Sequence, residues 1–468
     1  MKKFRIIKVS LLAIGLFSVQ SCFVAKDYQR PDSVNTEAQF RTDIIATQDN
    51  TIADVSWQEF FSDATLKSYI TKGLQNNLDI RTALQNIAVT EAYMKQGKAG
   101  YLPTLSVGPG YQYTKTSANT QFGRFTGSQS LSQYDLTGNF SWEADIWGKI
   151  RSNYRGATAN YLQTIEAHKA VQTNIVSTIA NTYFQLIALD EQKRAINQTI
   201  GFREQSFETI KALKEAGQVT QVAVNQTEAQ LYNAKALLVD VEASIKVNEN
   251  VLNVLLGETP KVLERGTINN QTLYSSLGVG VPAQILENRP DVKAAEYALV
   301  NAFENVNIAN ANFYPSLTLT ASGGVQGIDI DKLFDAQSLF ANVVARLAQP
   351  ILQKRQIRTA KEVALANQEK ALLAYKKTIL SASQEVSDAM ARYQAADAKI
   401  PLKDKEAALY NQSIEYSEEL LNYGMANYLE VITAREAALN AELNSINAKL
   451  SKLNSVVELY RAVGGGWK

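Results

Sequence analysis

The sequence predicts a mixed α and β membrane protein built from two internal repeats. Each repeat supplies a strand hairpin to a transmembrane β-barrel shared between chains, and a long helical hairpin to a coiled coil. Three observations predict this fold. The second half of the chain repeats the pattern of the first. In both halves apolar residues alternate with small or polar ones over two short runs, and helical periodicity then continues for longer than a compact globular core needs.

The repeat emerges when the sequence is shifted along itself by about 210 residues. Pro103 matches Pro315 at an offset of 212 residues, whereas Gly217 matches Gly424 at an offset of 207. The first repeat therefore holds about five extra residues between Pro103 and Gly217. We place them in the glycine- and serine-rich piece TSANTQFGRFTGSQS, which is expected to form an extended loop.

In each repeat we expect a helix before the proline and two strands after it. Asp79 and Asp291 are placed to cap the helices, which Pro103 and Pro315 would end. The apolar residues of the four predicted strands are Leu105, Val107, Tyr111 and Tyr113; Leu136, Phe140, Trp142, Ala144 and Ile146; Leu317, Leu319 and Ala321; and Val343, Ala345 and Leu347. Such alternation, with aromatic ends, is typical of strands that face lipid on one side and water on the other. A half-buried strand in a soluble sandwich is the alternative.

After the strands, helical periodicity runs over residues 149–216 and 355–423 with almost no helix-breaking residue. A helix of that length measures roughly 100 Å. After turns at Gly217 and Gly424 the chain is expected to return through a second alanine-rich helix, which gives an antiparallel coiled hairpin. Pro401 lies inside the second long helix and is expected to kink it or to mark an irregular segment, because proline removes one backbone donor.

Four strands per chain are too few for a barrel, because bacterial outer-membrane barrels have at least about eight. An open sheet in lipid would leave unpaired backbone groups along both edges. After the N-terminal region, no segment has the roughly 18 consecutive apolar residues of a membrane helix. The sequence therefore predicts that several copies share one barrel.

The N-terminus has the pattern of a lipoprotein signal peptide. Basic residues precede the apolar run VSLLAIGLFSV, which is too short to span a bilayer. Ser21 then provides the small residue expected before a cleavage site, and Cys22, the only cysteine, follows it. We expect cleavage before Cys22 and acylation of its thiol, with an ordinary signal peptide and an unmodified cysteine as the alternative. A disulfide within one chain is excluded, since Cys22 has no partner.

Composition excludes several classes of function. A formal net charge of +1 with mixed signs gives no nucleic-acid footprint. The only histidine, His168, cannot form a metal site or a catalytic triad by itself, and we expect it to be an ordinary surface or interface residue. Glycines 464–466 end a helix and are not a phosphate cradle, and there is no P-loop. We expect no enzymatic activity, cofactor or metal. A lipoprotein hydrolase and a passive periplasmic coiled-coil scaffold or adaptor are the alternatives from other classes.

Six segments together resemble the TolC-like outer membrane efflux proteins, especially the lipidated, OprM/NodT-like branch that serves resistance-nodulation-division pumps. In chain order they are CFVAKDYQRP, SWQEFFSDATLKSYITKGLQNNLDIRTAL, SWEADIWGKIRS, ENRPDVKAAE, QPILQKRQIRTAKE and LYRAVGGGW. The resemblance implies a homotrimer with a shared twelve-stranded barrel in the outer membrane, surrounded by lipid and continued by a long α-helical tunnel across the periplasm.

The same resemblance implies a passive exit duct for small molecules, such as drugs, toxic compounds or ions, in a tripartite pump. A periplasmic adaptor (membrane fusion) protein and an inner-membrane transporter would be its partners. The exit channel of an ATP-driven type I protein secretion system is the alternative within the family.

The resemblance also implies a gate where the hairpin tips of three chains meet. Relatives often have an aspartate or arginine two positions after the second tip glycine, and some have a tyrosine three positions before it. Ala426 and Leu421 stand there in this chain, which departs from the familiar ion-pair latch. The gate candidates are Glu418, Tyr423, Gly424, Asn427, Tyr428, Glu430 and Arg435 in the second repeat, with Gly217, Gln218 and Gln221 in the first.

For each charged candidate a solvated helix face is the alternative. Glu430 and Arg435 are five positions apart, so they are poorly placed to pair with each other within one chain. We expect them to bond to neighbouring helices instead.

These inferences divide the chain into five parts: a signal peptide (1–21), a lipidated extended segment (22–54), a first repeat (55–258), a linker (259–276) and a second repeat (277–468). Within the repeats, the strand hairpins are expected at about 104–147 and 316–349, and the long helical hairpins at about 149–256 and 355–463.

Overall fold

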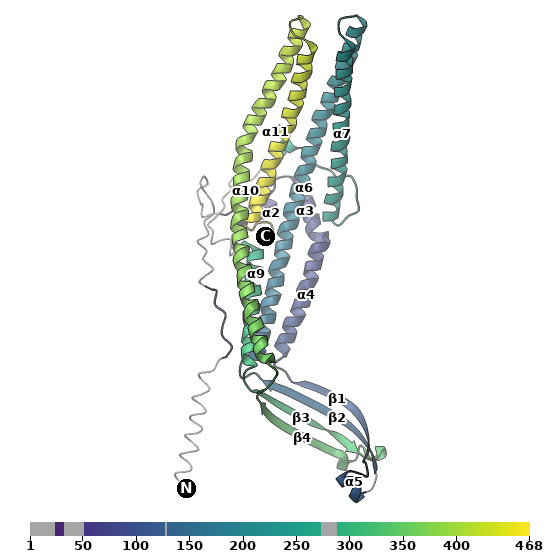
Figure 1. Cartoon of the computed structure of the whole chain (residues 1–468), viewed down its shortest axis with the longest axis vertical. Coiled ribbons are helices and arrows are strands. Elements are labelled where there is room, and N and C mark those ends of the chain that lie inside the picture. The colour runs from purple at the N-terminus through teal and green to yellow at the C-terminus, as the bar shows by residue number, and fades with distance from the viewer. Residues whose placement is uncertain (1–23, 32–50, 127–128, 273–287) are drawn as a thin grey trace. The chain divides into compact units, whose positions relative to one another are not determined.

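The computed structural model describes residues 24–31, 51–126, 129–272 and 288–468 (Figure 1). The signal peptide, Cys22 and part of the linker lie outside the described residues. The chain forms two compact units. Unit 1 contains Ala88–Gln163, Ala295–Ala374 and the N-terminal segment that ends at Pro31, and unit 2 contains Thr164–Ala294, Tyr375–Lys468 and the segment that ends at Ile87.

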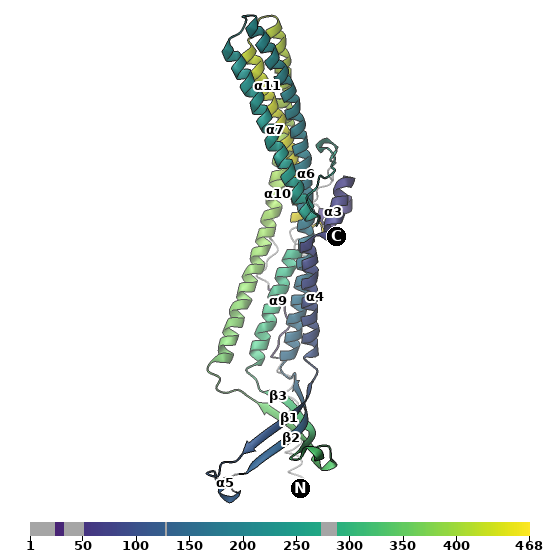
Figure 2. The ribbon, with the colours of Figure 1, turned by 90° about the vertical axis from the view of Figure 1, so that its right-hand side faces the viewer.

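Matching elements of the two repeats have the same length, which confirms the predicted duplication. Helices α4 (Leu78–Ala99) and α9 (Pro290–Ala311) each have 22 residues. The long helices α6 (Lys149–Glu215) and α10 (Gln356–Asn422) each have 67, and the returning helices α7 (Gln221–Leu255) and α11 (Tyr428–Ala462) each have 35. Helix α7 runs back beside α6, and α11 runs back beside α10 (Figure 2).

The four strands form one antiparallel sheet in the order β1-β2-β3-β4. The strands are β1 (Thr104–Lys115), β2 (Ser130–Ala144), β3 (Ser316–Gly327) and β4 (Leu339–Ala348). The remaining short helices are η1 (Ile52–Asp54), α2 (Trp57–Phe60), α3 (Ala64–Asn76), α5 (Gln121–Thr126), η2 (Ile268–Asn270), η3 (Ile330–Lys332) and η4 (Ala336–Ser338).

The strand register places most apolar residues of the four strands on one face of the sheet; Phe340 and Val344 of β4 are exceptions on the other face. Leu105 lies opposite Phe140, Phe140 opposite Ala321, and Ala321 opposite Val343. Neighbouring rows are polar; one of them joins Ser106, Asn139, Ser322 and Asn342. The apolar row is exposed at both edges of the sheet, with 73% of Leu105 and 70% of Val343 accessible. Such a face needs an apolar surrounding, because exposed apolar surface of this extent is unfavourable in water.

The connection between β1 and β2 corrects an expectation. It was predicted as an extended loop that holds all the extra residues of the first repeat, but it contains helix α5, whose start is stabilised by the Thr120 hydroxyl accepting the N–H of Gly123 at 3.1 Å. Strand β2 has 15 residues and β4 only 10, so part of the extra length lies in the strand.

The two predicted N-caps were wrong. Asp79 lies in the first turn of α4, and the cap is Asn77, whose side-chain oxygen accepts the N–H of Asp79 at 2.9 Å. The amide of Asn77 also donates to the carbonyl of Leu255, which fixes its orientation. Asp291 likewise lies inside α9, where its carboxylate pairs with Arg289 at 2.6 Å.

Helix α10 continues through Pro401, so the expectation of an irregular segment at this residue was wrong. Proline removes only one hydrogen bond of the helix ladder, and side chains on either side of it bond to α11. Asp397 pairs with Lys452 at 2.6 Å, and Asp404 accepts the hydroxyl of Ser445. These bonds hold both flanks of the proline against the returning helix.

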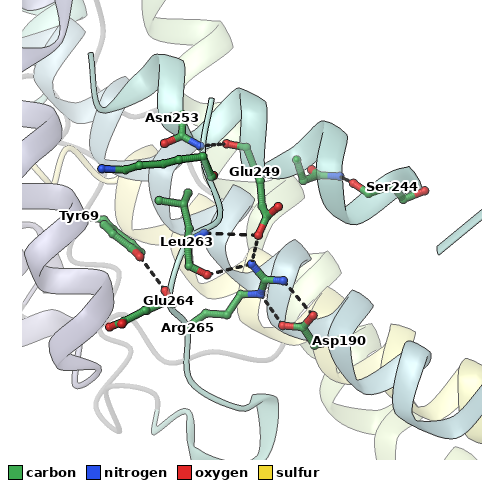
Figure 3. Close-up of polar contacts among 10 residues, drawn as sticks. Tyr69, Asp190, Ser244, Glu249, Asn253, Leu263, Glu264 and Arg265 are labelled. Carbon is green, nitrogen blue, oxygen red and sulfur yellow. Dashed lines mark hydrogen bonds and ion pairs between the residues drawn. The ribbon is translucent and has the colours of Figure 1, made fainter. Parts of the chain in front are cut away.

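In unit 2, the start of the linker is fixed by a polar cluster (Figure 3). The Arg265 guanidinium pairs with Asp190 of α6 and, at 2.5 Å, with Glu249 of α7. The hydrogen bonds that Arg265 donates to Asp190 raise the pKa of Arg265 above its ordinary value, and burial opposes that shift. Nearby, the Tyr69 hydroxyl of α3 donates to the carbonyl of Glu264 at 2.7 Å. The linker therefore cross-links three helices.

In unit 1, the N-terminal segment is bound to α6 and α9. Arg30 forms two 2.7 Å bonds to the Glu296 carboxylate. The side chain of Asn307 accepts from the N–H of Lys26 at 3.2 Å and donates to its carbonyl at 2.9 Å. Asp27 accepts from Arg155 of α6 at 2.6 Å, so side chains at two positions of the piece KDYQR, Asp27 and Arg30, hold the segment to the helices.

Of the helices in the described part of the chain, none combines the length and apolar character of a membrane-crossing helix.

Arg265→Ala should lower the free energy of unfolding by about 3–5 kcal/mol, because it leaves the buried Glu249 carboxylate without its cation. Lys235→Ala is the matched control, since it removes an exposed pair between α7 and α6 (Lys235 to Glu204, 2.8 Å). It should cost less than about 1 kcal/mol. The measurement is chemical unfolding of the purified protein followed by far-ultraviolet circular dichroism. Equal losses in the two variants would contradict the proposed role of the buried charge.

Candidate functional site at the ends of the helical hairpins

The two long hairpins end in turns of the same geometry. Gly217 and Gly424 have φ values of 76° and 73°, in the left-handed region that favours glycine. Each glycine donates back to the helix it ends, and the next residue bonds to the carbonyl one residue earlier in that helix: Gln218 N–H to the carbonyl of Leu213, and Met425 N–H to the carbonyl of Leu420. The expected turn role of both glycines agrees with this geometry.

Helix α11 begins at a side-chain cap that α7 lacks. The Asn427 side chain accepts the N–H of Glu430 at 3.1 Å, whereas Thr220, at the same place before α7, makes no such bond. Glu430 thus contributes its backbone to the site, and its side chain is exposed. An acidic residue in a first helical turn also interacts favourably with the helix dipole.

Arg435 connects three helices. Its guanidinium pairs with Glu418 of α10 and lies 4.7 Å from the centre of the Phe202 ring of α6. A guanidinium over an aromatic face is attracted by the electron density of the ring. Arg435 therefore bonds to neighbouring helices, as its spacing from Glu430 led us to expect, and those helices belong to the same chain.

Tyr428 connects the second hairpin to the first. Burial raises the pKa of Tyr428 above its ordinary value, and the side chains of Ser206 in α6 and Thr227 in α7 oppose that shift. Because these two side chains are close enough to act on its hydroxyl, Tyr428 places the start of α11 beside both helices of the first hairpin.

Other candidates remain at the exposed ends of the hairpins. In the second hairpin, Tyr423 is 74% exposed. In the first, Gln218 and Gln221 are also exposed, and the Gln221 amide donates to Asn225 of its own helix at 2.9 Å. The structure thus brings Glu418 and Arg435 into one bonded set, with Tyr428 close enough to feel both charges, and leaves Tyr423, Gln218 and Gln221 outside it.

A cavity of about 410 Å³ lies beside this bonded set, between α6, α10 and α11. Its wall has charges of both signs, including Arg203, Glu415 and Glu442. Burial lowers the pKa of Arg203, while Glu436 opposes that shift. Glu442 is paired with Arg194 of α6 at 2.9 Å, which adds a further bond between the hairpins.

Nothing in the described residues resembles a catalytic or metal centre. No group of three histidine, cysteine or carboxylate side chains within them could hold a metal ion. His168 is partly buried, and burial together with the charge of Lys169 lowers its pKa. A neutral, isolated imidazole agrees with the expected structural role of this residue.

Sequence reasoning missed the partners of the site residues. Phe202, Ser206 and Thr227 lie on the first hairpin, about 200 residues from the side chains that they contact, and Glu418 was named without its partner. The only signal in the sequence for these contacts was the alignment of the two repeats, which places Thr227 and Tyr428 at the same end of their hairpins.

Comparison with known proteins gives a consistent result. The model of the family described as "Outer membrane efflux protein" matches residues 69–258 and 281–465, one range for each repeat. The chain is 28% identical to "Toluene efflux pump outer membrane protein TtgF" of Pseudomonas putida, over 98% of this chain and 97% of that protein. It is 26% identical to "Probable outer membrane lipoprotein SilC" of Salmonella typhimurium, over 98% and 99%.

Among solved structures, one of a CusC channel superposes with a TM-score of 0.85 at 25% identity, covering 95% of this chain and all of the other.

Proposed function

Because this chain belongs to the outer membrane efflux protein family and is an outer membrane channel of efflux pumps, we propose that three copies form one passive exit duct. The observation that supports this most directly is the sheet. One of its faces is apolar across all four strands, and the other is mostly polar, with Phe340 and Val344 as its apolar members in β4. A strand array with lipid on one side and water on the other requires this division.

The edges of the sheet support the trimer. Strands β1 and β4 each have a neighbour on one side only within the chain. Backbone groups in hydrocarbon must be paired, so β1 of one chain is expected to bond to β4 of the next. Three chains would then close a twelve-stranded barrel, which agrees with the even strand numbers of bacterial outer-membrane barrels.

The passive role follows from the chemistry of the chain. The sequence contains no P-loop, and the site at the hairpin ends consists of structural pairs without a nucleophile and base. The energy for transport therefore comes from a partner, which we propose is an inner-membrane transporter joined to the hairpin ends by a periplasmic adaptor. The name of TtgF, a toluene efflux pump protein, supports a pump for small molecules over a protein-exporting system.

We also propose that Cys22 is acylated. Ala25 packs closely on Gly148, which lies in the connection between β2 and α6. A Cβ atom added to Gly148 would lie 2.8 Å from the Cβ atom of Ala25. Three residues of chain span at most about 11 Å, so the acyl chains would enter the membrane near the helix side of the sheet. Mass spectrometry of the mature protein should find a diacylated Cys22 as its first residue; an unmodified cysteine would contradict this.

Val343→Lys should remove the channel from the outer membrane, because it places a charge at the middle of the lipid-facing side of β4, at a cost of about 2–4 kcal/mol. Asn342→Lys is the matched control. Asn342 precedes Val343 in β4 and its side chain lies on the polar face, so a lysine at this position should be tolerated. The measurements are trimer recovery from outer-membrane fractions and restoration of toxic-compound resistance in a deletion strain. Tolerance of Val343→Lys, or equal failure of both variants, would contradict the assignment of the faces.

We further propose that the bonded set of Glu418 and Arg435, together with Tyr428, holds the periplasmic end of the duct closed, with Asn427 and Glu430 at the start of α11 beside it. Tyr428 and Arg435 attach the second hairpin to the first. A constriction formed by the second hairpins could widen only if these bonds were broken.

Tyr428→Phe should raise single-channel conductance in planar bilayers, because it removes the hydroxyl that lies close to Ser206 and Thr227 of the first hairpin while it retains the ring. Tyr232→Phe is the control, since Tyr232 is 62% exposed on α7 and its hydroxyl is absent from this set. An unchanged conductance for Tyr428→Phe, or an equal rise in the control, would contradict a latch at Tyr428.

A further inference from the structure

The segment that joins β4 to α10 in unit 1 exposes large apolar side chains to an unusual degree. Ile351 is 85% exposed and Leu352 is 93% exposed. Both follow directly after the last lipid-facing residues of β4, among them Leu347, which is 66% exposed. The apolar face of the sheet thus continues into this segment.

Aromatic residues mark the same level of unit 1. The Trp147 ring stacks on Tyr314 with 4.8 Å between centroids, and its indole N–H donates to the carbonyl of Pro315 at 2.7 Å. Trp142 donates to the carbonyl of Tyr101 at 3.0 Å. Tryptophan and tyrosine gather where a membrane protein crosses from hydrocarbon to water, because their rings are apolar and their N–H or O–H groups need partners.

Cations follow immediately after the exposed apolar pair. Arg355 is paired with Glu362 at 2.9 Å. Lys354 and Arg358 are exposed, and neither has a hydrogen-bond or ion-pair partner among the residues that the structure describes. Together with Ile351 and Leu352, these two cations line a cavity of about 570 Å³.

The backbone of this segment is strained. Lys354 and Arg355 have φ values of 46° and 67°, in the left-handed region that side chains other than glycine rarely adopt. In the first repeat the position that matches Arg355 is Gly148, with φ of 76°. The second repeat therefore keeps Arg355 in a conformation for which the first repeat uses a glycine, and it has a second left-handed residue, Lys354, where the first repeat has none. Strain of this kind is an indication of function.

We propose that this segment is a binding site for an anionic phospholipid at the periplasmic face of the outer membrane. Lys354 and Arg358 would bind the lipid phosphate, and Ile351 and Leu352 would contact its acyl chains. The inference rests on the proposed function, which places the apolar face of the sheet in lipid.

Charge and position favour a lipid over a second copy of the chain. The two unpaired cations match the phosphate and the negative charge of an anionic headgroup. The exposed apolar pair adjoins the lipid-facing strand on one side and the cations on the other, which is the order that a lipid presents from acyl chain to headgroup.

The test compares binding of two brominated lipids to the full-length protein in vesicles. Dibrominated phosphatidylglycerol and dibrominated phosphatidylcholine quench tryptophans that they touch. Trp147 stacks on Tyr314, the residue after Phe313 of the cavity wall, and Trp142 lies on the apolar face of the sheet. The wild-type protein should bind phosphatidylglycerol more tightly than phosphatidylcholine, with an affinity about five-fold higher for each of the two cations. Lys354→Gln with Arg358→Gln should lose this preference, and so should wild type at high salt. The matched control is Lys370→Gln with Lys377→Gln, which removes two exposed cations from α10 farther from the strands and should keep it.

Each other outcome overturns the inference in a distinct way. Equal affinity of wild type for both lipids, or the same loss in the control, would show that no specific site exists. Loss of trimers in the Lys354 and Arg358 double variant, on native gels, would assign the segment to contacts between copies. Absence of quenching by either brominated lipid would instead contradict the proposed membrane location itself.

Discussion

The pairing register of the four-stranded sheet is the constraint on which the rest of this structure depends. Side chains alternate between the two faces of a strand, so a shift of one residue in any strand would exchange its apolar and polar sets. In this chain Phe140 is matched by apolar or small residues on both sides, and its neighbour Asn139 by polar ones. With the faces separated in this way, the sheet can lie between lipid and water, and the helices can remain in the aqueous compartment.

Away from the sheet, bonds between elements far apart in the sequence fix the helices. Arg265 joins the linker to α6 and α7, and Arg289 joins the start of α9 to Glu385 of α10. Arg289 also donates to the carbonyl of Ala462, at the end of α11. Removing such a buried cation lowers the free energy of unfolding, because the carboxylates that it pairs with are left as buried charges without a partner. The hairpins therefore have rigid attachments at their bases, while the bonds near their free ends are fewer and more exposed.

The sequence could predict the periodic parts of this fold. The internal repeat and its long helical periodicity anticipated the two helical hairpins, and alternation anticipated the strands. It could not predict features that depend on distant partners. Asn77 and Asp79 are both plausible caps, and only the carbonyl of Leu255, 178 residues away, favours Asn77. Tyr428 was one of many polar candidates, and its distinction depends on Ser206 and Thr227, which no local pattern connects to it.

The duplication of the chain has a consequence for symmetry. Three copies of a twice-repeated chain would present six hairpin ends of nearly the same backbone geometry, which gives the periplasmic end of the duct an approximate sixfold axis. The side chains restrict that axis to threefold, because Gln218 of the first repeat is matched by Met425 of the second, which is 77% exposed. A partner that surrounds this end would meet polar and apolar contacts in alternation. Six copies of such a partner would therefore occupy two kinds of position, with unequal affinities.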